Sequence, residues 1–308
     1  MTIAPLRIGI DVSKAWLDVF NTRTGVPERV ANTPEAVAQF AVSLPRACTI
    51  VFEATAPYDT LLRQLLAPSG CRLIRVNPAR ARDFARAAGF LAKTDTIDAR
   101  MLAAMAGAIE LPDEAAYDAE RERLIARHRR RDQLVEMRAK DRGRLVSAAD
   151  DYERASLERH IHWLSQEIAM VDKDLRKLLQ QPAFARKAEI LRSVKGIGDV
   201  TVTTLLALMP ELGQRPAKAI AALAGLAPIN CDSGTFRGQR HIHGGRRRVR
   251  QALYMAALVA IQNTPRFKDY YQRVTARSGH AKVGIVAVAR KLLVIVNAML
   301  KKGELFRA

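Results

Sequence analysis

The chain has 308 residues, of which 49% are hydrophobic, so it can bury a sizeable core and wholesale disorder is excluded. Its 50 Lys and Arg residues outnumber 31 Asp and Glu residues, which gives a formal net charge of +19. A positive excess of this size favours a polyanionic partner, of which nucleic acid is the commonest. A membrane surface is the rival, but the sequence has no run of about 20 uninterrupted apolar residues and no signal-peptide pattern at residues 1–7.

The three cysteines, Cys48, Cys71 and Cys231, are isolated in the sequence and odd in number. This pattern argues against a disulfide framework and against a cysteine-based zinc site, and it favours a reducing compartment. His241 and His243 have no companion ligands at zinc spacing, and we assign them no role. We therefore expect a cytoplasmic protein.

Residues 1–110 are predicted to form a mixed α/β layer fold. Three short apolar runs are expected to form a strand meander, and strands and helices then alternate as in open α/β sheets. The predicted strands are 6–11, 16–20, 26–30, 49–53 and 72–76, and the predicted helices are 33–44, 57–66 and 78–88.

Four acidic residues stand where functional groups gather in such a fold. Asp11 ends the first strand and Glu53 ends a central strand, and functional groups of open α/β sheets collect at the carboxyl ends of strands. Asp95 and Asp98 lie in the first turn of a further helix that Thr94 caps, and at this spacing they share one face. Each acid alone has a plain explanation as a turn, cap or solvated residue. Together they predict a site for a divalent cation, because hard cations take carboxylate oxygens.

Residues 111–182 are dense in Arg, Glu, Asp and Leu and almost free of Gly and Pro. They are predicted to form two long helices with a break near Gly143 or at 148–151. Apolar residues from Leu157 to Leu178 step by three and four and form a single seam. The seam fits an intramolecular helical hairpin and a dimerising coiled coil equally well. The basic stretch 127–131 favours contact with a nucleic-acid backbone.

The segment 191–200 places Lys195, Gly196 and Gly198 between a helix and the apolar run 202–209. Helix, Gly-x-Gly turn and helix is the helix-hairpin-helix arrangement, in which amides at the start of the second helix bind a phosphate. A tight turn between two helices is the alternative. The charge of Lys195 and of the whole chain favours phosphate binding.

Asp232-Ser233-Gly234 stands in the most arginine-rich part of the chain, which three further predicted helices follow at 252–262, 265–275 and 280–301. On spacing alone Ser233 is better explained as a turn residue than as a nucleophile, because no adjacent His or Lys would activate its hydroxyl. Flanking arginines would, however, hold a phosphate beside it. These six arginines are Arg237, Arg240, Arg246, Arg247, Arg248 and Arg250.

Two sets of motifs in the same order resemble the DEDD transposases, which are bacterial insertion-sequence recombinases related to pilin-gene invertases. The first set is Gly9-Ile-Asp11-Val-Ser-Lys, Glu53-Ala-Thr-x-x-Tyr58, Val76-Asn-Pro78 and Lys93-Thr-Asp95-x-x-Asp98-Ala. The second set is Ala-Gly-Leu-Ala-Pro228, Asp-Ser233-Gly and Gly244-Gly-Arg-x-x-Val-Arg-x-Ala-Leu-Tyr-Met-Ala256. DEDD exonucleases share the acronym, but they carry Asp-x-Glu on the first strand, where this chain has Asp11-Val12-Ser13.

The resemblance implies a RuvC-like, RNase H-type N-terminal domain in which Asp11, Glu53, Asp95 and Asp98 bind Mg²⁺ or Mn²⁺. It implies that Ser233 is the nucleophile and forms a covalent serine–DNA intermediate. It further implies guidance by a structured RNA, as in RNA-guided bridge recombinases, and a homo-oligomer that is a dimer or, on DNA, a tetramer.

We therefore expect a RuvC-like metal-binding domain at 1–110, a helical coiled-coil linker at 111–182, and a mostly α C-terminal domain with a helix-hairpin-helix-like element and the serine at 183–308. The expected function is that of a DNA transposase or site-specific recombinase. Nucleic-acid contacts are expected at Lys195, Gly196, Gly198 and the six arginines. The alternatives are a Holliday-junction-type endonuclease that uses metal-activated water, and a non-enzymatic nucleic-acid-binding protein whose acids are structural.

Overall fold

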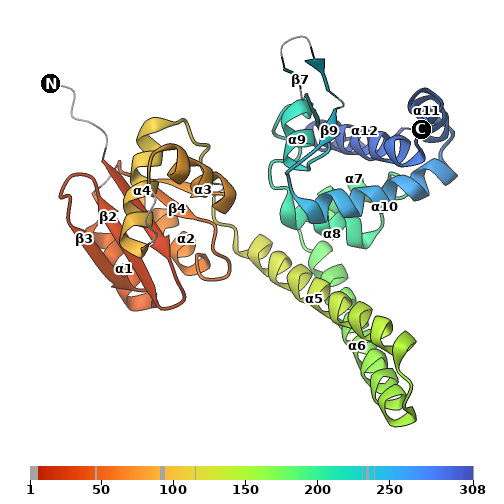
Figure 1. The fold of residues 1–308 in the computed structure, drawn as a ribbon, viewed down its shortest axis with the longest axis horizontal. Helices are drawn as coiled ribbons and strands as arrows, with labels where there is room; N and C mark the ends of the chain where they lie inside the picture. Colours follow the sequence, from red (N-terminus) through yellow and green to blue (C-terminus); the bar gives the residue numbers. More distant parts are fainter. Residues whose placement is uncertain are drawn as a thin grey trace. The chain divides into compact units, whose positions relative to one another are not determined.

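A computed structural model describes residues 6–45, 47–90, 94–114, 116–230, 232–233, 236–238 and 240–307, with the backbone alone at Phe236 and Arg237. Lys93 of the first motif set and Cys231 lie outside the described residues. The chain divides into two units, Met1–Tyr117 and Asp118–Ala308 (Figure 1). The predicted bounds at 110 and 182 stay predictions.

The first unit contains a five-stranded mixed sheet with the strand order β3-β2-β1-β4-β5. Strands β1 (Arg7–Val12), β2 (Trp16–Asn21) and β3 (Pro27–Ala31) form the predicted antiparallel meander. Strands β4 (Thr49–Glu53) and β5 (Arg72–Val76) run parallel to β1. The predicted mixed α/β fold of the N-terminal region is therefore confirmed.

Helices cover both faces of this sheet (Figure 1). On one face, α1 (Pro34–Ser43) and α2 (Thr60–Leu66), which the short 3-10 helix η1 (Ala67–Ser69) follows, pack on the alternate residues Ile8, Ile10 and Val12 of β1. On the other face lie α3 (Pro78–Ala87) and α4 (Asp95–Ala108). Gly9 faces α4, and a Cβ atom at this position would overlap the carbonyl oxygen of Ala99, so helix and strand meet backbone to backbone.

Cys48 and Cys71 are not isolated in space, contrary to the expectation from their spacing. Each precedes one of the neighbouring parallel strands β4 and β5, and their Sγ atoms lie 2.7 Å apart as free thiols. Burial, followed by the hydrogen bond to Cys71, raises the pKa of the Cys48 thiol to about 12.

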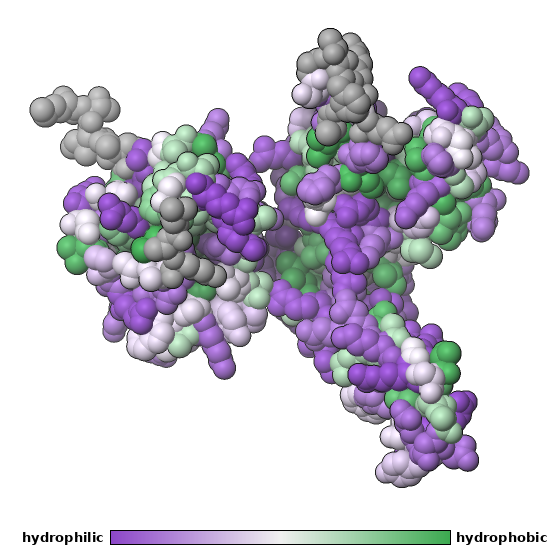
Figure 2. Space-filling view, in the orientation of Figure 1, coloured by the Kyte–Doolittle hydropathy of each residue, from purple (hydrophilic) through white to green (hydrophobic). Residues whose placement is uncertain are grey.

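The second unit begins with a helical hairpin formed by α5 (Ala119–Ser147) and α6 (Asp151–Leu179). The chain turns at 148–150, the second of the two predicted breaks, and Asp150 caps α6 by accepting a hydrogen bond from the Glu153 amide. Within the chain the seam forms the intramolecular hairpin, with Leu164 and Ile168 packed on Leu134. Hydrophilic side chains cover most of the visible face of the hairpin, with apolar ones between them (Figure 2).

In the described part of the rest of this unit, six further helices surround one core. The central one is α8 (Asp199–Leu208), in which every residue from Thr201 to Ala207 is buried. The others are α7 (Ala185–Arg192), α9 (Ala217–Leu223), α10 (Arg247–Asn263), α11 (Pro265–Ser278) and α12 (Ala281–Lys302). Between α9 and α10 two short ladders pair β6 (Pro228–Ile229) with β9 (His241–Ile242) and β7 (Asp232–Ser233) with β8 (Phe236–Arg237).

Helix α12 is long and apolar enough, by length and composition, to cross a membrane. It contains Arg290 and Lys291 near its middle, and Val288, Leu292 and Val296 are fully buried against the other helices of the unit. Its apolar character is thus explained by packing in the core.

Candidate metal site and nucleic-acid interface

A row of charged residues crosses three neighbouring strands of the first unit. Asp11 of β1 lies directly opposite Asp18 of β2, and Asp18 lies directly opposite Arg29 of β3. Residues opposite each other in antiparallel strands project from the same face. Asp11 follows Gly9 by two residues, so the row lies on the face that α4 covers.

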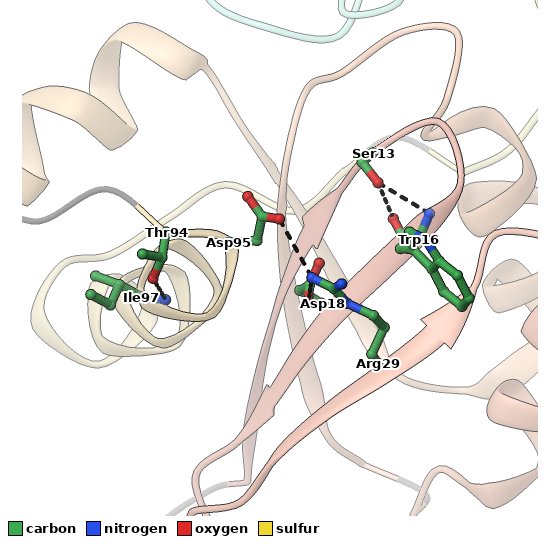
Figure 3. A network of polar contacts seen from close by, with 7 residues as sticks. All are labelled: Ser13, Trp16, Asp18, Arg29, Thr94, Asp95 and Ile97. Carbon is green, nitrogen blue, oxygen red and sulfur yellow. Dashed lines mark hydrogen bonds and ion pairs between the residues drawn. The ribbon is translucent and has the colours of Figure 1, made fainter.

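Two further elements bring acids to the same place. Glu53 ends β4 and follows the buried Val51 by two residues, and Val51 packs against α4. Helix α4 starts at Asp95, and its cap is the predicted Thr94, whose hydroxyl accepts a hydrogen bond of 3.3 Å from the Ile97 amide (Figure 3). Asp98 lies in the same first turn, where the helix dipole favours negative charge.

The other acids lie near enough to Asp11 to influence its ionisation. The pKa of Asp11 is raised from 3.8 to about 6, first by burial and then by the negative charges of Asp98, Asp95, Glu53 and Asp18. The structure thus brings the four predicted acids, hereafter the acid tetrad, together at the carboxyl ends of β1 and β4 and the start of α4. Their roles remain predictions.

Sequence reasoning missed two charged residues beside the acid tetrad, namely Asp18 and Arg29 (Figure 3). Nε of Arg29 donates a hydrogen bond of 2.8 Å to Oδ1 of Asp18, and its Nη2 lies 3.5 Å from Oδ2 of Asp95. The guanidinium also lies over the ring of Trp16, with Cζ 5.9 Å from the ring centroid. The signal that could have found them is the register of the predicted hairpin, which sets Asp18 opposite Asp11.

Ser233 belongs to the second unit, where it is the last residue of β7 and is exposed. Its backbone pairs with Phe236 of β8 at the end of this short ladder. In the part of the chain that the structure describes, no side chain hydrogen-bonds to the Ser233 hydroxyl.

Comparison with known proteins decides which family these motifs indicate. A profile of the IS110-type DEDD transposase domain matches residues 8–153, and a profile of the transposase IS116/IS110/IS902 family matches residues 188–272. The pilin gene-inverting proteins of Moraxella lacunata and Moraxella bovis are each 28% identical over 263 residues, which cover 83% of this chain and 81% of the relative. The chain is an IS110-type transposase or recombinase. A protein of insertion element IS110 from Streptomyces coelicolor is 30% identical over 121 residues, 39% of this chain and 30% of that protein.

Membership of this family makes the protein a DNA recombinase, which binds DNA, and excludes the non-enzymatic alternative. The DEDD transposase domain has an RNase H-like fold, in agreement with the mixed sheet of the first unit. As a transposase it is expected in the cytoplasm. DEDD transposases generally use divalent metal ions, so the acid tetrad has to be tested for its fit to such an ion.

The donor set of the transposase fits a hard divalent cation, because it consists of carboxylates; burial and then the charges of the neighbouring carboxylates raise the pKa of Asp11. Among the described residues, no three His, Cys, Asp or Glu side chains are gathered closely enough to hold one as they stand. Asp95 is also shared with Arg29. The acid tetrad is therefore suited to a cation in chemistry and charge.

The arginines before and at the start of α10, which we predicted to contact nucleic acid, largely have partners inside the unit. Arg246 forms two hydrogen bonds of 2.6 and 2.7 Å with the Glu211 carboxylate. Burial raises the pKa of Glu211, but the hydrogen bonds and charge of Arg246 outweigh burial and lower it. Arg248 pairs with Asp132 and Glu136 of α5, and Arg250 donates to the carbonyl oxygen of Gly244 at 2.7 Å.

The other residues predicted to contact nucleic acid are mostly exposed. Arg247 and Arg240 are exposed, and the side chain of Arg237 lies outside the described residues. Gly196 has a φ of +102°, and a Cβ there would meet the backbone of α10, so this glycine is explained by close packing. Lys195 and Gly198 are exposed, and Gly198 is the N-cap residue of α8, where it forms no side-chain cap. A phosphate-binding role for this turn stays a prediction.

A basic groove of about 810 Å³ lies between α11 and α12. Its cations, hereafter the groove cations, are Arg240, Arg273, Arg277 and Lys291. Among the described residues none of the four forms an ion pair, and no acidic side chain lines the groove. The Lys291 ammonium lies 4.2 Å from the centroid of the Tyr270 ring. Burial, and then the charges of Arg266 and Arg273, lower the pKa of Lys291, so the groove carries mutually repelling positive charge.

Proposed function

We propose that this transposase cuts and rejoins DNA strands through a covalent serine–DNA intermediate, with Ser233 as the nucleophile and the acid tetrad as the cation site. The observation that supports this most is the meeting of negative charges at Asp11, whose pKa is about 6. Perturbed carboxylate clusters of this kind are typical of catalytic sites. The exposure of Ser233 supports its part in the proposal, since a nucleophile for DNA has to be reached by a strand.

In the proposed step, Oγ of Ser233 attacks a backbone phosphorus, and the new Oγ–P bond replaces the bond to a deoxyribose oxygen. The serine loses its proton and the leaving oxygen gains one, so the charge is balanced. A strand hydroxyl reverses the step and joins the phosphate to new DNA, so that no external energy source is consumed. A bound Mg²⁺ or Mn²⁺ supplies Lewis-acid stabilisation of the phosphate charge.

We also propose where nucleic acid contacts the second unit. The groove cations have no acidic competitor among the described residues, and paired arginines would have to give up an internal partner before binding a phosphate. The groove cations, Arg247 and Lys195 are therefore the proposed backbone contacts, with Gly196, Gly198 and Arg237 as further candidates. Guidance by a structured RNA, and assembly into a dimer or a tetramer on DNA, are proposals that rest on the family resemblance.

The test is a search for a covalent adduct. The protein is incubated with labelled donor and target DNA, Mg²⁺ and the RNA that co-purifies with it, and the products are separated under denaturing conditions. We expect a protein–DNA adduct that disappears in Ser233→Ala and persists in Ser147→Ala, which removes another exposed serine hydroxyl. Cleaved DNA without any adduct would instead support the junction-resolving endonuclease, which uses the same acids and a water molecule.

A further inference from the structure

Arg29 contacts two carboxylates, and its contact with Asp18 is shorter and more buried than its contact with Asp95. Its Nε and Nη2 both lie 2.8 Å from Oδ1 of Asp18, whose side chain is only 10% exposed. Its contact with Asp95 is 3.5 Å long, and the Asp95 side chain is 61% exposed. Removing the partner of a buried carboxylate is costly, and an exposed ion pair contributes little. Asp18 therefore anchors the guanidinium, and Asp95 is the partner that can leave.

Within the part of the chain that the structure describes, the guanidinium of Arg29 also has N–H donors that are free to bind another group. An arginine carries five N–H donors in a planar fork, and this geometry matches the oxygens of a phosphate. Among the described residues, Nη1 of Arg29 has no hydrogen-bond partner. The side chain is 51% exposed and projects from β3, the edge strand of the sheet, so a nucleic-acid strand can reach it.

We propose that Arg29 is a phosphate-binding residue of the acid site, which Asp18 positions and which Asp95 occupies until Asp95 binds a metal ion. The proposal rests on the function proposed above. It accounts for a cation placed beside the acid tetrad, where it would otherwise only weaken the affinity for a metal ion. When Asp95 turns to its role as a metal ligand, it releases Arg29, and a non-bridging oxygen of the DNA phosphate takes its place. Asp18 keeps the guanidinium beside the site during this exchange.

Trp16 provides a direct readout of this exchange because it lies under the guanidinium. The chain has two tryptophans, so Trp163→Phe leaves Trp16 as the single fluorophore. We expect Mg²⁺ alone, added to the metal-free protein, to change the Trp16 emission, and this change to be absent in Arg29→Ala. An emission that responds equally in both proteins would show that Arg29 does not move with the acids.

The second measurement is DNA affinity with Ca²⁺ in place of Mg²⁺, so that binding is read without strand transfer. Arg29→Ala is expected to weaken binding about tenfold, as for the loss of one charge-assisted hydrogen bond, and to reduce the salt slope by about one. Arg29→Lys should restore the slope but only part of the affinity, because the fork is lost. Arg23→Ala is the matched control, since Arg23 is exposed in the same hairpin.

The outcomes separate the possibilities. Arg29→Ala could lower the melting temperature and still bind DNA as tightly as the control Arg23→Ala. That result would make the Asp18–Arg29 pair a purely structural ion pair and would overturn the proposal. If Arg29→Ala fails to fold, Arg29→Lys takes its place. The proposal is then overturned if Arg29→Lys binds DNA with unchanged affinity and its Trp16 emission does not respond to Mg²⁺. A missing serine adduct contradicts the proposed function, whereas binding in Ca²⁺ tests Arg29 independently of it.

Discussion

Asp11→Asn is expected to stabilise the metal-free protein, although it removes a proposed ligand. The pKa of Asp11 is about 6 instead of 3.8, because burial and four neighbouring carboxylates oppose its ionisation. One pKa unit corresponds to about 1.4 kcal/mol. Without screening by solvent, the ionised Asp11 would therefore destabilise the folded state by about 3 kcal/mol at neutral pH. Since Asp11 is only partly buried and solvent screens these charges, we expect about 1–2 kcal/mol.

The pH dependence has a definite sign. A raised carboxyl pKa means that the folded state takes up the proton more readily than the unfolded state. The resulting stabilisation is complete below pH 3.8 and is lost as the pH rises through about 6. The gain from Asp11→Asn should therefore be largest at pH 7.5 and become small near pH 4.

The assay is urea unfolding in EDTA at pH 4, 5.5 and 7.5, followed by Trp16 fluorescence in the Trp163→Phe background, so that the first unit is observed. Asp83→Asn is the matched control, because Asp83 is exposed on α3. The reasoning would be refuted if Asp11→Asn were less stable than its parent at pH 7.5. A difference that did not depend on pH would refute it as well.

Three further outcomes follow from the site and the groove. In the acid tetrad, Glu53→Gln, Asp95→Asn and Asp98→Asn should each abolish strand transfer and leave the circular dichroism spectrum unchanged; full activity in two of them would contradict the metal site. Removing three groove cations together, by Arg273→Ala, Arg277→Ala and Lys291→Ala, should reduce the slope of log affinity against log salt by about two to three. Arg246→Ala should lower the free energy of unfolding by about 1–2 kcal/mol, because Glu211 loses both hydrogen bonds. It should change the slope of log affinity against log salt less than the triple groove variant does.

The strands and helices of the first unit could be predicted because local patterns encode them. Short apolar runs mark the strands and the cap Thr94 marks a helix start, and both signals act within a few residues. The acid tetrad could be predicted because strand ends and helix starts fix where its members project. The pairing of Asp18 with Arg29 depends on hairpin register, which the composition of either strand does not display.

The arginines near the start of α10 show why long-range pairing escapes sequence reasoning. Their spacing suggests a free basic cluster, but Arg246 pairs with Glu211 and Arg248 with Glu136, 35 and 112 residues away along the chain. Conversely, the groove cations come from α11, α12 and a loop, so no continuous segment reveals them. The neighbourhood of Cys48 and Cys71 was missed for the same reason, since it follows from the parallel pairing of β4 and β5.

Gly9 controls the separation between the two halves of the acid tetrad. Two acids, Asp11 and Glu53, belong to the sheet, and two belong to α4, while the only spacer between strand and helix at this point is a hydrogen atom on Gly9. A methyl group here would push the Ala99 carbonyl away and carry Asp95 and Asp98 with it. The chemistry of the site can thus be attenuated from a position that bears no functional group, although every carboxylate is still present.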